Sequence, residues 1–194
     1  MSVIQGIRAV IDKTVGFMQY STMITGTMER NLDLTEIING EEIMGPSPFF
    51  KHQRIVSKLH LTIGQYVKKN MLGEVHIYPL DVIFDEGVNR LQPDILFIRK
   101  ENLSIAKDWI RGVPDMVCEI ISPGSYEMDT AVKKAIYEKY RVPEYWIVMP
   151  EPQTIEILTI ESDKYKLHSV AAFEGVVTSK VIEGLQVNVN DIFE

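Results

Sequence analysis

Short apolar runs with the length and composition of β-strands occur along this chain, and two of them each contain a single acid. Residues 94–98 (Asp-Ile-Leu-Phe-Ile) and 116–121 (Met-Val-Cys-Glu-Ile-Ile) are rich in β-branched residues and bounded by Pro, Gly or charge, which predicts two buried strands. Their acids are Asp94 and Glu119. A buried, unpaired carboxylate is costly unless it takes up a proton. We therefore expect both acids to need a partner, and a divalent cation is a natural one.

One long stretch, residues 49–70, has a helical period. Its apolar stripe consists of His52, Val56, Leu59, Ile63 and Tyr66. A second stripe, about 120° away around the helix, consists of Lys51, Arg54 and Lys58. This basic stripe is either a solvated face or a surface that contacts phosphates. His52 is either a partly buried structural histidine or a catalytic group.

A second helix is predicted from Asp129, a suitable N-cap, to about Tyr140. On this helix Lys133 shares a face with Tyr137 and Tyr140, which should pack inward. An inward-facing lysine near a helix start is unusual. Its ammonium either reaches back to solvent or meets the buried acids.

The remaining patterns predict strands and turns. Residues 32–44 predict a short element, an Asn39-Gly40 turn and a strand, whereas residues 100–112 predict an exposed loop or short helix. Pro93 marks a strand edge or bulge beside Asp94. Further strands are predicted at residues 74–85, 88–99, 144–149, 154–161 and 165–173, the last two as a hairpin.

Composition narrows the class of protein. An apolar content of 45% with 24% charged residues is typical of a soluble globular protein, and 194 residues suffice for one domain with its own core. The single cysteine, Cys118, excludes an intramolecular disulfide framework and a Cys-rich zinc site. No segment is apolar enough to span a membrane or resembles a signal peptide, so we expect a cytoplasmic protein. The net charge of −7 argues against indiscriminate nucleic-acid binding, although residues 45–73 contain no acid and five basic residues.

Six motifs occur together in the order and spacing of one family. They are Ile37-Ile38-Asn39-Gly40-Glu41, His52-Gln53, Gln92-Pro93-Asp94, Glu119-Ile120-Ile121-Ser122-Pro123, Asp129-x-x-x-Lys133 and Val142-Pro143-Glu144-Tyr145-Trp146-Ile147-Val148. From about Leu34 to the C-terminus the chain resembles the Uma-type restriction endonucleases of the PD-(D/E)XK nuclease superfamily. The resemblance implies an α/β (α+β) fold, restriction-endonuclease-like, with a mixed central sheet flanked by helices and extra C-terminal antiparallel strands. It leaves residues 1–30 as an N-terminal extension of a single domain, residues 31–194.

The resemblance also implies a metal site for Mg²⁺ or Mn²⁺. Its ligands would be Asp94, Glu119 and the carbonyl of Ile120, a set that suits a hard cation. The superfamily lysine, two residues after the strand acid, is replaced here by Ile121, and Lys133 of the next helix takes its place. Glu41 would supply a further carboxylate, and His52 would contact the site. The alternative is that Asp94 and Glu119 are structural acids paired with Lys or Arg.

The implied activity is metal-assisted hydrolysis of DNA phosphodiester bonds by a homodimer, with DNA bound along Lys51, Arg54 and Lys58. Two alternatives stay open. The first is a non-catalytic module that binds nucleic acid or protein on the same fold, and the second is a hydrolase of a small phosphorylated metabolite.

Overall fold

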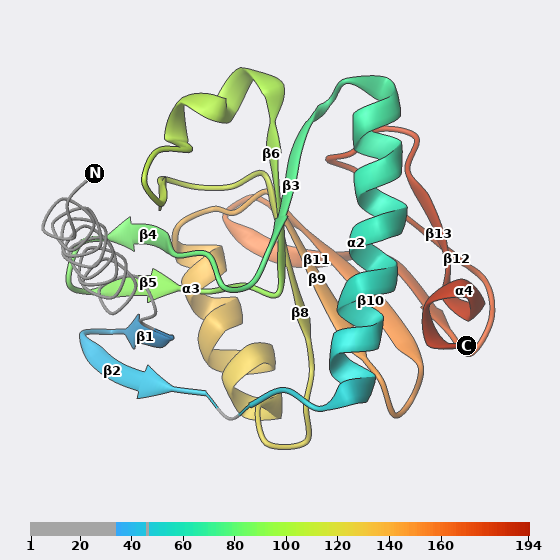
Figure 1. Ribbon diagram of the computed structural model, residues 1–194, viewed down its shortest axis with the longest axis horizontal. Coiled ribbons are helices and arrows are strands. Elements are labelled where there is room, and N and C mark those ends of the chain that lie inside the picture. The colour runs from blue at the N-terminus through green and yellow to red at the C-terminus, as the bar shows by residue number, and fades with distance from the viewer. Residues whose placement is uncertain (1–33, 46) are drawn as a thin grey trace, which may run out of the picture. The chain divides into compact units, whose positions relative to one another are not determined.

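The computed structural model describes residues 34–45 and 47–194 (Figure 1). The predicted extension, residues 1–30, lies outside the described residues. Residues Thr35–Glu194 group into one unit by their internal contacts. The division of the chain into an extension and one domain from residue 31 stays a prediction.

A mixed six-stranded sheet forms the centre of this unit. Its strand order is β11-β10-β9-β8-β6-β3, in which β8 and β9 are parallel and all other neighbours are antiparallel. The strands are β3 (Gly73–Ile77), β6 (Ile95–Arg99), β8 (Met116–Ile120), β9 (Glu144–Met149), β10 (Thr154–Glu161) and β11 (Lys164–Ala172). The predicted fold class is confirmed, including the antiparallel C-terminal strands β10 and β11.

A smaller sheet has the order β2-β1-β5-β4-β7, and two further strands pair with each other. The strands are β1 (Thr35–Ile38), β2 (Glu41–Met44), β4 (Val82–Asp85), β5 (Asn89–Leu91), β7 (Ile110–Arg111), β12 (Val176–Thr178) and β13 (Gln186–Asn188). The predicted Asn39-Gly40 turn joins β1 to β2, with φ of 54° and 85° at its two residues. Such positive φ values suit the hairpin turns that asparagine and glycine favour.

Two of the predicted strands are wrong in length. Residues 74–85 form β3 and β4, and residues 88–99 form β5 and β6, so that each predicted strand contributes to both sheets. The breaks lie near Pro79 and at Pro93, because proline has no N–H to donate to a sheet. Residues 100–112 contain the 3₁₀ helix η1 (Lys100–Ile105) and β7, whose Ile110 is buried rather than exposed.

Helices cover the two faces of the central sheet (Figure 1). The long helix α2 (Phe50–Asn70) buries Val56, Leu59 and Ile63 of its predicted stripe in one core cluster, which also contains the short helix α4 (Val189–Phe193). The π-helical segment η2 (Met128–Lys133) continues into α3 (Lys134–Lys139), which packs in the other cluster. No helix in the described part of the chain is long and apolar enough to cross a membrane.

The alternation of side chains along β8 decides where its acid points. Met116, Cys118 and Ile120 belong to the cluster of α2, whereas Val117 and Ile121 belong to the cluster of α3. Since successive strand residues face opposite sides, Glu119 faces α3 and not α2. The acid therefore lies in the layer to which η2 and α3 contribute their inward residues.

Candidate active site

Asp94 lies just before β6 and joins three elements. Its Oδ2 accepts a hydrogen bond of 2.7 Å from the backbone N–H of Ile120 and lies 3.2 Å from Nε2 of His52 on α2. Because Pro93 and Asp94 interrupt the sheet, the carboxylate occupies the place of a backbone acceptor at the end of β8. Burial lowers the pKa of His52, but the hydrogen bond and the charge of Asp94, with the Ile120 backbone, outweigh it and raise that pKa.

Glu119 is buried between the sheet and α3, with 3% of the residue exposed. Its Oε1 accepts a 2.6 Å hydrogen bond from the hydroxyl of Tyr137 and lies 3.3 Å from Nζ of Lys133. Burial raises the pKa of Glu119 well above its usual value, against the opposing effect of Lys133 and with further increases from neighbouring acids. The site thus favours the addition of positive charge beside this carboxyl group.

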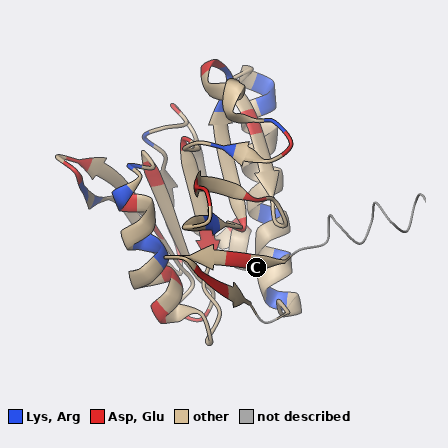
Figure 2. Ribbon diagram, turned by 90° about the vertical axis from the view of Figure 1, so that its left-hand side faces the viewer, with Lys and Arg blue, Asp and Glu red and all other residues tan. Residues whose placement is uncertain are grey.

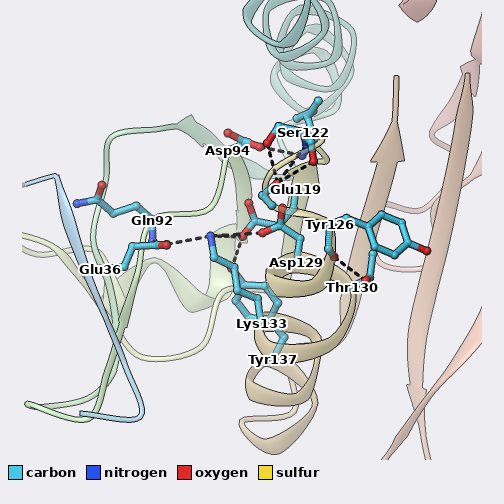
Figure 3. A network of polar contacts seen from close by, with 12 residues as sticks. Glu36, Gln92, Asp94, Glu119, Ser122, Tyr126, Asp129, Thr130, Lys133 and Tyr137 are labelled. Atoms are coloured by element: carbon cyan, nitrogen blue, oxygen red, sulfur yellow. Dashed lines mark hydrogen bonds and ion pairs between the residues drawn. The ribbon is translucent and has the colours of Figure 1, made fainter. Parts of the chain in front are cut away.

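Lys133 lies at the centre of the cluster (Figure 3). Its Nζ is 3.0 Å from Glu36 Oε1, 3.3 Å from Glu119 Oε1 and 3.7 Å from Asp129 Oδ1. Burial lowers the pKa of Lys133, but Glu119, Glu36 and Asp129 together outweigh that effect and raise it. The lysine is therefore a charged, buried group, and the alternative of an ammonium reaching solvent does not hold, since 6% of the residue is exposed.

Two acids of this cluster, Glu36 and Asp129, were not among the predicted site residues, although Asp129 belongs to the motif Asp129-x-x-x-Lys133. Glu36 comes from β1, where its carboxylate also accepts a 2.7 Å hydrogen bond from the backbone N–H of Gln92. Asp129, predicted to be an N-cap, lies instead within η2, where its own N–H donates to the carbonyl of Ser125. Burial raises the pKa of Asp129, whereas Lys133 lowers it. The available signal was its i, i+4 spacing from Lys133, which puts both side chains on one helix face.

The other predicted site residues lie farther out. Glu41 is exposed on β2, and the acid of this hairpin that contacts Lys133 is Glu36. The basic stripe runs along α2, a helix without any acid (Figure 2). Two of its members contact the protein itself: Lys51 pairs with Glu151 at 3.0 Å, and Nζ of Lys58 donates to the carbonyl of Asp191 at 2.9 Å.

The charge balance of the cluster decides whether it fits a metal ion. Four carboxylates face two basic groups: Glu36, Asp94, Glu119 and Asp129 against Lys133 and His52. The acids thus outnumber the bases in a largely buried site, where a carboxylate without a counter-charge is costly and tends to take up a proton, in agreement with the raised pKa of Glu119 and of Asp129. Oxygen donors with excess negative charge are the environment that Mg²⁺ and Mn²⁺ prefer.

Only two of the three proposed metal ligands are side chains. No group of three or more His, Cys, Asp and Glu side chains within residues 34–45 and 47–194 is arranged to hold a metal ion. The expected set needs only two carboxylates, because Mg²⁺ retains several waters and the third ligand is a backbone oxygen. The N–H of Ile120 donates to Asp94, and the N–H and C=O of one strand residue point to the same side, so the Ile120 carbonyl faces the side of Asp94. These three residues therefore fit a hard divalent cation.

Comparisons with known proteins give a family and a fold. A family model described as "Uma2: Putative restriction endonuclease" matches residues 18–190. The chain is also similar to a crystal structure described as "a putative nuclease belonging to DUF820 from Anabaena variabilis", with a TM-score of 0.67 and 21% sequence identity. This likeness covers 82% of this chain and 89% of that chain, and at this identity it shows a shared fold. No curated protein matches the chain.

Proposed function

The chain belongs to the Uma2 family, whose description is "Putative restriction endonuclease", and from this premise we propose that it is a metal-dependent nuclease that hydrolyses DNA phosphodiester bonds. One observation carries the proposal. Asp94, Glu119 and Lys133 come from three separate parts of the chain and meet at one end of the central sheet, in a cluster with more acids than bases. A family of nucleases supports hydrolysis of nucleic acid, while the metal and the DNA substrate are the proposed parts.

Asp94, Glu119 and the Ile120 carbonyl would hold Mg²⁺ or Mn²⁺. The bound ion would supply Lewis-acid polarisation of a phosphate oxygen and a lower pKa for the attacking water. The remaining work falls to the chain itself. Lys133 donates hydrogen bonds toward that water and offsets the charge that develops on the phosphate. Glu36 and Asp129 hold the ammonium from two further sides, which fixes its position before the substrate arrives.

His52 supports Asp94 from the helix side. The 3.2 Å contact between Nε2 and Oδ2 orients the carboxylate, as side chains that hydrogen-bond to metal ligands do in general. The basic side chains Lys51, Arg54 and Lys58 would contact the DNA backbone from α2. The homodimer and the cytoplasmic location stay predictions.

A non-catalytic binding module is the second candidate function. The observation in its favour is that both proposed metal-binding carboxylates already contact a basic group, since Glu119 pairs with Lys133 and Asp94 pairs with His52. A self-contained ion cluster of this kind also occurs for purely structural reasons.

Metal titration separates the two candidates. Mg²⁺ and Mn²⁺ are titrated by calorimetry into wild type, Glu119→Gln and the control Glu101→Gln, which changes an exposed acid on η1, and plasmid cleavage is followed on the same samples. The nuclease predicts metal binding and cleavage in wild type and control, and loss of both in Glu119→Gln. A wild-type protein that binds neither ion and leaves the plasmid intact would refute the proposed nuclease activity. Metal binding without cleavage of any DNA would point to a small phosphorylated substrate.

A further inference from the structure

An apolar pocket of about 520 Å³ lies beside the candidate active site. It is formed by the start of α2, the loop after β8 and the turn after β9. Ligands of open α/β sheets usually bind at this position, beyond the carboxyl ends of parallel strands. The volume also lies within the range of about 300–1,000 Å³ that is usual for small-molecule sites.

The pocket and the candidate site share a wall. His52 lines the pocket and contacts Asp94 through Nε2 at 3.2 Å. Ile121 and Ser122, also in the lining, directly follow the proposed ligands Glu119 and Ile120. A group bound in the pocket would therefore lie one side chain away from the carboxylate at which a phosphate would be cleaved.

Two aromatic rings stand exposed at this pocket. Phe49 is 70% exposed and Tyr126 is 59% exposed, and both belong to the lining. In Figure 3 the ring of Tyr126 points away from Lys133, on the outer side of the helix. Exposed aromatic surface beside a polar site is unfavourable in water and is a common platform for a flat, apolar ligand.

We propose that this pocket receives an unpaired nucleobase of the DNA substrate, stacked against Phe49 and Tyr126. The inference rests on the proposed function and narrows its substrate to DNA with single-stranded or locally opened nucleotides next to the cleaved bond. A base has two flat apolar faces and a polar edge, so it suits rings and apolar walls together with the hydroxyl of Ser122 in the lining. Lys51 and Glu151, which are also in the lining, form an ion pair at 3.0 Å, so this wall of the pocket is close to neutral.

The charge of the protein agrees with this choice of substrate. The net charge is −7, and Lys51 is paired with Glu151, so that a phosphate-only mode of binding duplex DNA has little support. Stacking supplies binding energy that does not depend on net charge. A base pocket next to the carboxylates thus explains how an acidic chain holds DNA.

Binding without cleavage tests the pocket. Fluorescein-labelled single-stranded 12-mers and the matching duplex are titrated in EDTA, with anisotropy as the readout. A 12-mer carrying 2-aminopurine reports stacking by quenching of its fluorescence. Phe49→Ala and Tyr126→Ala should each weaken single-strand binding about tenfold and abolish the quenching, with duplex binding changed less than twofold. Tyr126→Phe, which keeps the ring, should bind as wild type does.

Phe50→Ala is the matched control, because Phe50 is the adjacent aromatic residue, is 84% exposed and lies outside the pocket lining. Circular dichroism and thermal unfolding verify that each variant is folded. Equal binding of single strand and duplex by wild type, or pocket variants that behave like Phe50→Ala, would overturn the inference. If the pocket variants bind single-stranded DNA normally while Glu119→Gln loses cleavage, the proposed nuclease activity is supported and the proposed base pocket is refuted. Quenching of 2-aminopurine fluorescence without metal-dependent cleavage supports the base pocket and refutes the proposed nuclease activity.

Discussion

The Nζ of Lys133 lies 3.3 Å from Oε1 of Glu119, although the two residues belong to a helix and a strand. In the superfamily pattern the lysine and the acid are two residues apart on one strand. Here Ile121 occupies that position and packs in the apolar cluster of α3. The ammonium reaches the acid from the facing helix, so the same pair of charges is built from a different part of the chain.

Removing this ammonium should affect cleavage and stability together. Lys133→Met leaves three acids around a buried, uncharged side chain, which should lower the free energy of unfolding by about 3–5 kcal/mol. Loss of one charge-stabilising group should lower the cleavage rate at least about 100-fold. Urea unfolding and plasmid cleavage measure the two effects. Lys134→Met is the matched control, because it changes the adjacent lysine, which starts α3. A Lys133→Met variant that cuts DNA at the rate of this control would contradict the assignment.

Glu36 and Glu41, two of the three acids of the first hairpin, should differ in their effect on cleavage. Glu36→Gln removes the charge 3.0 Å from Lys133, and we expect the turnover rate to fall about tenfold with little change in KM, because a positioning residue acts through the lysine. Glu41→Gln, on the exposed strand β2, should behave as wild type does. Steady-state cleavage of an oligonucleotide measures both constants. A larger effect of Glu41→Gln would show that Glu41 and not Glu36 serves the site.

Glu144 is a buried acid with a structural role. Its Oε1 accepts from Trp146 Nε1 and Ser179 Oγ, and its Oε2 accepts from the backbone N–H groups of Lys180 and Val181. Glu144→Gln would turn one oxygen into an NH₂ group that faces donors, which should cost about 3 kcal/mol of stability. Mg²⁺ affinity should stay unchanged. Thermal unfolding and calorimetry measure these quantities, with Glu156→Gln on β10 as the control. Loss of metal binding in the folded Glu144→Gln variant would place this acid in the site instead.

Acidic pH should weaken the contact between α3 and β11 that Glu138 makes. Hydrogen bonds from Lys164 Nζ and the Tyr165 N–H lower the pKa of Glu138 below its usual value of 4.5. The folded state then binds a proton at Glu138 less tightly than the unfolded state does. The contribution of the Glu138 carboxylate to stability is therefore present above pH 4.5 and is lost as pH falls through the pKa of Glu138 in the folded state. Glu138→Gln should lower the melting temperature at pH 7, and the difference from wild type should close below pH 4.5.

Melting temperatures between pH 3 and pH 7 test this dependence. Glu174→Gln, which changes an exposed acid, serves as the control and should follow wild type throughout. A difference between Glu138→Gln and wild type that persists undiminished at pH 3 would mean that the charge of Glu138 does not contribute.

The sequence by itself determined the local elements and the principal acids. The strand around Glu119, the helix predicted over residues 49–70 and the Asn39-Gly40 turn each depend on neighbours in the chain. All three elements are present, with the helix at Phe50–Asn70. The alternation along β8 also fixes that Glu119 faces opposite to Cys118 and Ile120.

Only the tertiary structure decided which other side chains join these acids. Glu36 reaches Lys133 because the β1 hairpin packs beside η2, and no local pattern encodes that contact. The contact of Asp129 with Lys133, in contrast, follows from their i, i+4 spacing on one helix. Residues 74–85 and 88–99 are continuous in sequence but divide between two sheets, since the prolines break the ladder and each half finds a different partner. Contacts between distant segments depend on packing of the whole core, and a linear pattern records only the neighbours along the chain.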